Sequence, residues 1–321
     1  MNAQAQAKSQ PQSPTLTLSS DLLTGTEWSA AHVQELFRLA THVKAHPERY
    51  KSALAGRSLA MIFEKPSLRT RVTFEVGIAS MGGTAVFLDH AETHLGERES
   101  IPDVGRSLSR WVHGIVGRVF SQEALEILAA HATVPVINAL SDVYHPCQTL
   151  CDFFTIEEKF GTARGLKLAY VGDGNNVCNS LMVAGARVGA HVRIATPAGY
   201  EPDAEILAAA RRDSAATEGS IELFRAPEEA VSGAQAVYTD VWASMGQESE
   251  ADARAAIFAP YQVNAKLMSQ AAPDAVFLHC LPAHRGSEVT DEVMESPRSI
   301  VFDEAENRLH VQKAILLMLL S

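Results

Sequence analysis

The most constraining feature of this sequence is a regular alternation of short apolar runs with longer amphipathic segments. The short runs predict buried strands, and the longer segments, whose apolar residues recur at helical spacing, predict helices. The predicted strands are residues 58–63, 84–88, 114–119, 134–138, 166–171, 191–195, 236–239 and 276–279, and residues 300–302 are expected to continue the pattern. The predicted helices are residues 29–46, 69–81, 101–112, 122–130, 144–159, 179–188, 205–211 and a segment that starts at Glu304. Such alternation with short links is typical of a doubly wound α/β fold, in which helices cover both faces of a parallel sheet.

The length of the chain predicts more than one such unit. The 321 residues, of which 46% are hydrophobic, exceed one ordinary core, so we expect two doubly wound parallel-sheet domains. The first comprises residues 16–150 together with a C-terminal helix at about 305–321, and the second comprises residues 151–304. Residues 1–15, which are rich in Gln, Ser, Ala and Pro, are expected to form a disordered tail. A transit peptide is the alternative, but such peptides are rich in arginine and the first arginine here is Arg38.

The turn after the predicted strand 58–63 has the composition of an anion site. Ser67 is a good helix N-cap, and the backbone N–H groups that follow it are unpaired and lie at the positive end of the helix dipole. Ser67 and Thr70 add hydroxyl donors, and Arg69 adds a planar guanidinium that suits phosphate oxygens. Taken alone, an ordinary N-cap followed by surface arginines explains this segment equally well.

The overall charge limits the kind of anion that this turn can bind. A formal net charge of -11 argues against a nucleic-acid surface and favours a small anion in a locally basic pocket. The cysteines Cys147, Cys151, Cys178 and Cys280 form no C-x-x-C pair, so neither a disulfide framework nor a zinc cluster is predicted, and a reducing compartment fits best. The sequence contains no signal-peptide core and no apolar run long enough to span a bilayer, so we expect a cytoplasmic protein without membrane contact.

Polar residues also follow most of the other predicted strands. In open parallel sheets, ligands bind beyond the carboxyl ends of the strands. The sequence places Arg118, His145, the segment 172–176, Asp240 and Cys280 at such ends. Because several polar residues follow strand ends in the same way, a shared binding site explains each of them better than it would explain a single isolated residue.

Each of these residues has a plainer explanation when it is taken separately. His145 and Gln148 are three positions apart and can both face a carbonyl group, but His145 can also simply begin a helix. Asp240 can hold a substrate ammonium group beneath a flexible loop at residues 244–246, or it can cap a turn. Cys280 has basic neighbours that are expected to lower its pKa and let it accept a proton, whereas a buried structural cysteine is the default.

The segment Gly172-Asp173-Gly174-Asn175-Asn176 resembles the start of a dinucleotide-binding loop. Val177 replaces the third glycine of that motif, and residues 195–197 stand where an acidic residue is expected. This departure disfavours a nicotinamide-dependent oxidoreductase. The asparagines are better explained as ligands for a carboxylate or an ammonium group.

Taken together, five segments closely resemble the aspartate/ornithine carbamoyltransferase family, and within it the members that act on ornithine. The segments are Ser67-Leu68-Arg69-Thr70-Arg71, His145-Pro146-Cys147-Gln148, Gly172-Asp173-Gly174-Asn175-Asn176, Asp240 with Ser244-Met245-Gly246, and His279-Cys280-Leu281-Pro282. The resemblance implies transfer of the carbamoyl group of carbamoyl phosphate to the δ-amine of L-ornithine, giving L-citrulline and phosphate in arginine metabolism, without a metal or an organic cofactor. It also implies that the first domain binds carbamoyl phosphate and the second binds ornithine, with the active site in the cleft between them. The family's usual assembly, a homotrimer or a multiple of it, is expected as well.

The resemblance assigns roles to individual residues. The expected contacts of carbamoyl phosphate are Ser67, Leu68 through its backbone N–H, Arg69, Thr70, Arg118, His145, Gln148, Cys280, Leu281 and Arg308. The expected contacts of ornithine are Asn176, Asp240, Ser244 and Met245. The expected catalytic residues are Cys280, Arg69, Arg118, His145 and Asp240. His94 lies in a loop that reaches a neighbouring subunit's site in the family trimer.

The implied chemistry agrees with these residue types. Attack by the amine places negative charge on the carbonyl oxygen and then on the departing phosphate, which donors from Thr70, Arg118 and His145 would stabilise. The amine must also lose a proton, because an unperturbed amine is protonated at neutral pH. Cys280 is the family's suggested proton acceptor, and Asp240 is expected to orient the amine.

Two alternatives remain open at this point. The protein could carbamoylate another amine, which the Ser244-Met245-Gly246 loop and Cys280 disfavour. It could also be a catalytically silent homologue that keeps only the anion site, but no expected phosphate or carbonyl ligand is missing from the sequence. Leu68 stands where many relatives have Thr, which is tolerable if only its backbone is used. The sequence leaves the direction of the reaction in the cell open.

Overall fold

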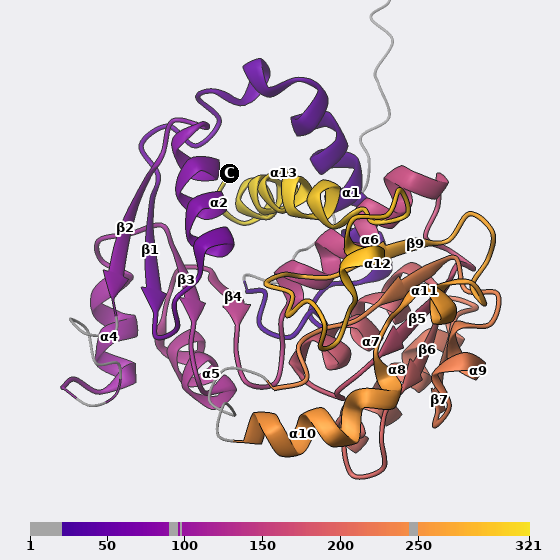
Figure 1. Cartoon of the computed structure of the whole chain (residues 1–321). Coiled ribbons are helices and arrows are strands. Elements are labelled where there is room, and N and C mark those ends of the chain that lie inside the picture. The colour runs from indigo at the N-terminus through magenta and orange to yellow at the C-terminus, as the bar shows by residue number, and fades with distance from the viewer. Residues whose placement is uncertain (1–20, 90–95, 97, 244–249) are drawn as a thin grey trace, which may run out of the picture.

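The strands of this chain form two separate, fully parallel sheets. The computed structural model describes residues 21–89, 96, 98–243 and 250–321. The first sheet has the order β2-β1-β3-β4 and consists of β1 (Ser58–Phe63), β2 (Thr84–Asp89), β3 (Gly114–Arg118) and β4 (Val136–Leu140). The second has the order β7-β6-β5-β8-β9 and consists of β5 (Lys167–Val171), β6 (His191–Ala195), β7 (Ser220–Phe224), β8 (Ala236–Tyr238) and β9 (Val276–Leu278). Helices alternate with these strands (Figure 1), so the predicted α/β fold with two doubly wound sheets is confirmed.

The helices vary widely in length. The longer ones are α1 (Ala30–Ala45), α2 (Leu68–Ala79), α4 (Ile101–Leu108), α5 (Gln122–His131), α6 (Pro146–Phe160), α7 (Asn176–Val188), α8 (Ala204–Ala215), α10 (Ala251–Phe258) and α13 (Val301–Leu320). The shorter ones are η1 (Pro47–Tyr50), α9 (Pro227–Val231), η3 (Ala259–Tyr261), α11 (Ala265–Met268) and α12 (Asp291–Met294). None of the helices in the described part of the chain combines the length and the apolar character that a membrane crossing requires.

The order of the strands fixes where a ligand can bind. In the first sheet β1 lies between β2 and β3, and in the second sheet β5 lies between β6 and β8. The connections that leave neighbouring strands at these points run to opposite sides of the sheet. The loops beyond the carboxyl ends of these strands therefore diverge and leave a crevice. The segments 64–67 and 172–175 leave β1 and β5 at these two positions.

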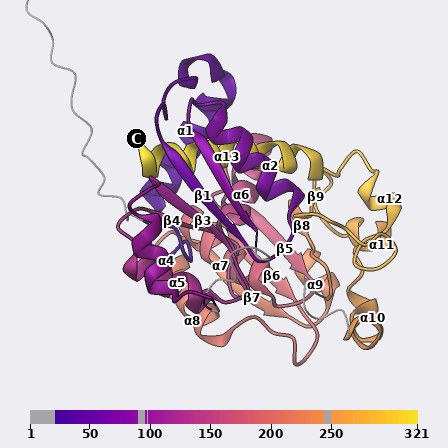
Figure 2. The same cartoon turned by 90° about the vertical axis from the view of Figure 1, so that its left-hand side faces the viewer.

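Two helices connect the sheets to each other. Helix α6 follows β4 and is buried continuously from Pro146 to Ile156. Helix α13 packs against α6 and also against α1 and α2 (Figures 1 and 2), although it follows the strands of the second sheet in the sequence. The C-terminal helix therefore packs on elements that precede the second sheet in the sequence.

Some local predictions were wrong or incomplete. Residues 300–302 do not continue the strand pattern, because Ile300 is the N-cap of α13 and Val301 is its first residue. Strand β7 was not predicted, because this strand is short and only its Ile221 is fully buried. Helix α7 begins at Asn176, three residues earlier than predicted, because the Asn175 side chain accepts hydrogen bonds from the N–H groups of Val177 and Cys178.

Gly174 shows why the glycine-rich segment 172–176 is not a dinucleotide loop. The backbone of residues 200–202 packs directly onto this glycine, and the Gly174 N–H donates to the carbonyl oxygen of Tyr200 at 2.9 Å. A Cβ atom at position 174 would collide with the backbone of Glu201 and Pro202, and it would lie 2.6 Å from the Tyr200 oxygen. In a dinucleotide-binding loop, a glycine at this place leaves space for the pyrophosphate to approach the backbone. Here the backbone of residues 200–202 fills that space.

We expect Gly174→Ala to destabilise the protein by about 1–3 kcal/mol, the usual cost of overpacking against backbone that has no room to move. Thermal unfolding monitored by circular dichroism would measure this loss. Gly77→Ala on α2 is the control for crowding, because the backbone there is helical and a Cβ would come no closer than 3.4 Å to a neighbouring side chain. A Gly174→Ala protein as stable as the wild type would contradict the packing described here.

Candidate active site

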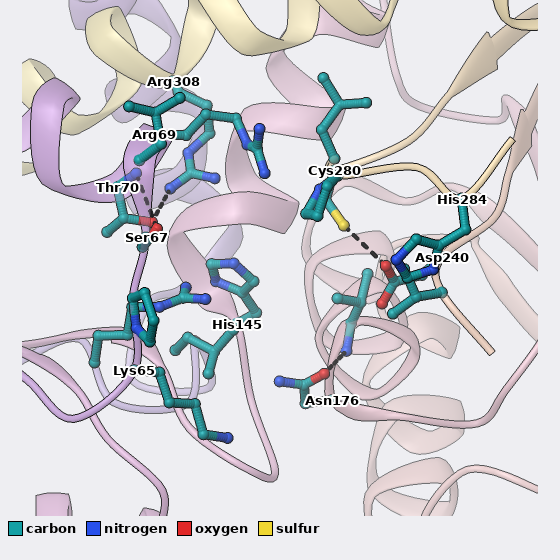
Figure 3. A pocket seen from close by; sticks show the side chains of 18 of the residues that line it. Lys65, Ser67, Arg69, Thr70, His145, Asn176, Asp240, Cys280, His284 and Arg308 are labelled. Carbon is teal, nitrogen blue, oxygen red and sulfur yellow. Dashed lines mark hydrogen bonds between the residues drawn. The ribbon is translucent and has the colours of Figure 1, made fainter. Parts of the chain in front are cut away.

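A cavity of about 580 Å³ lies between the carboxyl ends of the two sheets. Its walls come from the turn after β1, the ends of β3 and β4, the starts of α6 and α7, the loops after β8 and β9, and α13 (Figure 3). The residues that line it are Lys65, Pro66, Ser67, Leu68, Arg69, Thr70, Arg118, Leu140, His145, Asn176, Val177, Asp240, Val241, Ala243, Cys280, Leu281, Pro282, His284 and Arg308. The structure thus brings together all but one of the predicted site residues that it describes.

One end of the cavity is the N-terminus of α2. Ser67 is the N-cap, and its Oγ accepts a hydrogen bond from the backbone N–H of Thr70 at 3.3 Å. The Leu68 side chain is 75% exposed, so this residue offers the cavity mainly its backbone. The first turn of the helix therefore presents N–H groups and hydroxyls to the cavity, as the sequence predicts for an anion site.

Three guanidinium groups converge on this end. Arg308 is buried, and it donates from Nη2 to Thr70 Oγ1 at 3.1 Å and from Nη1 to Gln148 Oε1. Burial and, to a smaller extent, the nearby charges of Arg308 and Arg69 lower the pKa of Arg118 to about 10. Burial likewise lowers the pKa of Arg69, with a further contribution from Arg308. Because these cations repel one another, this end of the cavity is electrostatically suited to a compact, multiply charged anion.

A break in strand pairing contributes to this arrangement. Gly117 pairs with Asn138, but the next residue, Arg118, pairs with Leu140, so one residue of β4 is skipped. Such a bulge re-aims the side chains beside it. It lies where the first sheet meets the cavity, since both Arg118 and Leu140 line it.

His145 lies between the two ends of the cavity (Figure 3). Its backbone N–H donates to Ser180 Oγ at 2.7 Å, while the ring Nδ1 has no hydrogen-bond partner among the described residues. Burial, together with the charges of Arg308, Arg118 and Arg69, holds the pKa of His145 well below its usual value. A neutral imidazole at pH 7 follows, and it can donate one hydrogen bond to a carbonyl oxygen without adding a charge.

The opposite end of the cavity carries a carboxylate. Asp240 follows β8, and its two oxygens accept from Asn175 Nδ2 at 2.8 Å and from Cys280 Sγ at 3.1 Å. Asn176 lies beside it and is fixed by a hydrogen bond from its Nδ2 to the Ser141 carbonyl oxygen at 2.7 Å. The cavity therefore has an anion-binding end and an end that can hold an ammonium group.

The expected effect of basic neighbours on Cys280 was wrong. Burial raises the pKa of this thiol well above its usual value, and the negative charge of Asp240 raises it further. The thiol is thus a hydrogen-bond donor to Asp240 rather than a thiolate. His279, the preceding basic residue, does not counteract this effect, because its Nδ1 accepts the N–H of Leu281 at 2.9 Å and its Nε2 lies 3.3 Å from the Glu288 carboxylate.

Gln148 is the one described site residue that does not line the cavity. It is buried, its Nε2 lies 2.7 Å from Asp152 Oδ1 and 2.8 Å from Glu304 Oε1, and its Oε1 accepts from Arg308. Direct contact between Gln148 and a ligand stays a prediction. In the structure, Gln148 lies behind Arg308 as seen from the cavity.

The structure adds two basic lining residues that were not predicted from the sequence. Lys65 precedes the anion turn directly, and its Nζ lies 4.6 Å from the centre of the Phe120 ring. His284 follows Cys280 by four residues and borders the cavity with an exposed side chain. Both residues are close in the sequence to predicted site motifs, and this closeness is the signal that could have identified them as lining residues.

Several expected residues cannot be placed. Ser244, Met245, His94 and the tail 1–15 lie outside the described residues, so their roles stay predictions. Among the described residues, a group of potential metal ligands comprises Asp240, His279 and Cys280, whose ligand atoms lie within 4.8 Å of one another. Each of the three already has a hydrogen-bond or charge partner within the protein.

The two sheets coincide with two regions that match known families. Residues 20–158 match the family described as aspartate/ornithine carbamoyltransferase, carbamoyl-P binding domain. Residues 164–319 match the family described as aspartate/ornithine carbamoyltransferase, Asp/Orn binding domain.

Individual relatives are similar over nearly the whole chain. An ornithine carbamoyltransferase of Pyrococcus horikoshii is 53% identical over 293 residues, which cover 91% of this chain and 91% of the relative. The solved ornithine carbamoyltransferase from Pyrococcus furiosus superimposes with a TM-score of 0.91 at 51% identity, covering 94% of this chain and 96% of that one. The structure from Thermus thermophilus gives a TM-score of 0.86 at 48% identity, covering 95% and 100%.

The contact between Asp240 and Cys280 predicts how the thiol reacts. At pH 8 we expect iodoacetamide to modify Cys280 slowly, at a rate that rises with pH, because its pKa is raised and only the thiolate reacts. Asp240→Asn removes the negative charge that raises this pKa, so alkylation of Cys280 should become several-fold faster at the same pH. Peptide mass spectrometry measures the rate, and the fully buried Cys178 serves as an internal control. Equal rates in the two proteins across the pH range would refute an electrostatic effect of Asp240.

Proposed function

The chain belongs to the aspartate/ornithine carbamoyltransferase family, and from this premise we propose how its cavity transfers the carbamoyl group of carbamoyl phosphate to the δ-amine of L-ornithine, giving L-citrulline and phosphate. The observation that carries the proposal is the presence of both required ends in one cavity. Three guanidinium groups and a helix N-terminus fit the phosphate, and a buried carboxylate fits an ammonium group.

Carbamoyl phosphate is assigned to the end formed by the turn after β1, the end of β3 and α13. Ser67, the Leu68 N–H, Thr70 and the guanidinium groups of Arg69, Arg118 and Arg308 provide donors for the phosphate oxygens. The neutral ring of His145 then faces the carbonyl oxygen of the carbamoyl group. Cys280 and Leu281 border the same point from the loop after β9.

Ornithine is assigned to the end that carries Asp240 and Asn176. Asp240 and Asn176 are the described residues that would hold it, and Ser244 and Met245 complete the proposed set. In this arrangement Asp240, already fixed by Asn175, orients the δ-amine toward the carbamoyl carbon.

The reaction forms one bond and breaks one bond. The neutral amine attacks the carbonyl carbon, a C–N bond forms, and the C–O bond to phosphate breaks with its electron pair remaining on phosphate. Negative charge moves from the carbonyl oxygen to the phosphate, where His145, Arg118 and Thr70 can stabilise it. No metal or organic cofactor takes part in this scheme.

The amine proton needs an acceptor, and Cys280 cannot provide one independently. Its thiol already carries a proton that it donates to Asp240. Cys280 can accept a proton from the amine only if it passes its own proton to Asp240. We therefore treat Cys280 and Asp240 as one proton-accepting unit, in which Asp240 also orients the substrate.

The name of one relative bears on the place of this reaction in metabolism. The Pyrococcus furiosus relative, 52% identical over 293 residues, is named ornithine carbamoyltransferase, anabolic. We accordingly place the reaction in arginine biosynthesis. Steady-state kinetics in both directions test this assignment.

We also propose that the enzyme is a homotrimer, or a multiple of one, that acts in the cytoplasm. Helix α2 carries Leu68, Val72 and Val76 on one stripe, and these side chains are 75%, 45% and 48% exposed. Such an apolar stripe on a surface helix is suited to burial against a second copy of the chain. The four cysteines are all free thiols, which fits a reducing compartment.

Arg69→Ala tests the assignment of the phosphate end. Loss of one positioned cationic donor should lower kcat/KM for citrulline formation by about 10²-fold or more. Arg106→Ala is the matched control, since Arg106 is an exposed arginine on α4 that pairs with Asp103 on its own helix. Near-normal turnover by Arg69→Ala, or no citrulline from ornithine with the wild type, would reject the proposed function.

Val72→Glu tests the proposed assembly. Sedimentation velocity should find the wild type at about three times the mass of the 34.6 kDa chain, or at a multiple of that mass. A charge in the apolar stripe should shift the protein toward the monomer, because an unpaired carboxylate is costly to bury. A monomeric wild type, or an unchanged mass for Val72→Glu, would contradict this interface.

A further inference from the structure

Two carboxyl groups are buried directly behind the anion end of the cavity, and neither lines it. Asp152 lies on α6 and Glu304 on α13, and both are at most 1% exposed. The mechanism described above uses neither of them. Buried carboxyl groups are rare and costly unless they are paired, so this pair requires an explanation.

Hydrogen bonds connect the pair to the cavity through Gln148. The Gln148 Nε2 lies 2.7 Å from Asp152 Oδ1 and 2.8 Å from Glu304 Oε1, so one amide nitrogen bridges both carboxyl groups. Because its nitrogen is held in this way, the Gln148 oxygen faces Arg308 and accepts from Nη1. Arg308 then directs Nη2 to Thr70 in the anion turn.

Glu304 also connects to the opposite end of the cavity. Its second oxygen accepts the backbone N–H of His279 at 3.1 Å, next to Cys280. Asp152 Oδ2, in contrast, receives no N–H or O–H donor from the described residues. The Tyr238 hydroxyl, which also has no hydrogen-bond partner among the described residues, lies near the Asp152 carboxyl group, and so does the Glu304 carboxyl group. A hydrogen bond between the two carboxyl groups exists only if one of them carries a proton.

The surrounding charges favour one retained proton. The described titratable groups that face the pair are Arg308 on α13, Cys151 on α6, Tyr238 on β8, Cys280 after β9 and, within reach of Glu304, Arg69 on α2. Arg308 is the cation that stabilises the charged form of both carboxyl groups. One guanidinium can neutralise one carboxylate but not two. Burial raises the pKa of Asp152 to about 7, and burial together with Asp152 raises the pKa of Glu304 well above its usual value.

We propose that Asp152 and Glu304 share one proton, and that the resulting singly charged pair fixes Gln148 and, through it, the orientation of Arg308 toward the phosphate. Both are positioning residues, since neither touches the cavity. This inference rests on the proposed function only in naming the bound anion as carbamoyl phosphate.

The proposal has a definite dependence on pH. As pH rises through the pKa of the pair, the shared proton is lost and two negative charges face each other. The hydrogen bond between the carboxyl groups then disappears, and the fixed orientation of Gln148 and Arg308 is lost with it. Affinity for carbamoyl phosphate should therefore fall on the alkaline side of neutrality.

Asp152→Asn and Asp152→Ala separate positioning from simple packing. Asn keeps an oxygen for Gln148 and supplies a permanent N–H in place of the shared proton. Its affinity for carbamoyl phosphate at pH 7, measured by calorimetry, should stay within about threefold of the wild type, and the alkaline loss should be absent. Ala removes both contacts and should weaken binding by about tenfold to 100-fold, the effect of losing a hydrogen bond to a charged group.

Glu304→Gln provides a contrasting substitution. Both Glu304 oxygens accept from N–H donors, one from Gln148 and one from His279. A glutamine amide would turn one of these acceptors into a donor that faces another donor. This variant should therefore bind carbamoyl phosphate at least about tenfold more weakly than Asp152→Asn. Equal effects of Asn and Ala at position 152, or normal binding by Asp152→Ala, would overturn the proposal.

Infrared spectroscopy tests the shared proton in the wild-type protein itself, so this test does not depend on whether a variant folds. A protonated carboxyl band should be present at pH 7, should disappear at alkaline pH, and should be missing from Asp152→Asn. Its absence from the wild type at pH 7 would reject the shared proton. If the wild type makes no citrulline, the proposed function fails separately, while this band and the binding of inorganic phosphate still decide the inference.

Discussion

The convergence of Arg69, Arg118 and Arg308 on the first turn of α2 is the constraint on which the rest of the structure depends. Cations so close to one another repel, and partial burial removes much of the water that would screen them. The fold keeps them together by bringing each from a different element, α2, the end of β3 and α13, each held by its own packing. The scaffold therefore fixes the positions of these cations, and a bound anion supplies their counter-charge.

The same constraint explains the character of the other side chains nearby. Burial and the cations beside it lower the pKa of His145 and keep it neutral, so it acts as a hydrogen-bond donor without adding to their repulsion. Negative charge is kept at the far end, on Asp240, or behind the cations, on Asp152 and Glu304. This separation of charge along the cavity distinguishes a site for an anion and an amine from a general basic pocket.

Much of the fold and of the site could be predicted because both depend on short-range patterns. Strands such as 58–63 are buried apolar runs, and Ser67 is a local capping signal, so each could be recognised from a few neighbouring residues. The errors concern quantities that depend on distant parts of the chain. The pKa of Cys280 is raised by burial and by Asp240, forty residues away, and His279 beside it does not offset this rise. The position of Gln148 depends on Arg308 and Glu304, which no local pattern relates to it.

The contact between Thr70 and Arg308 joins residues that are 238 positions apart in the sequence. Closing so long a loop is entropically unfavourable until most other contacts exist, so the anion site should form late in folding. Partly folded chains would then have almost no affinity for the phosphate ligand. Ligand binding should consequently stabilise only the fully native state, and it should slow unfolding in proportion to the ligand concentration without guiding the early steps of folding.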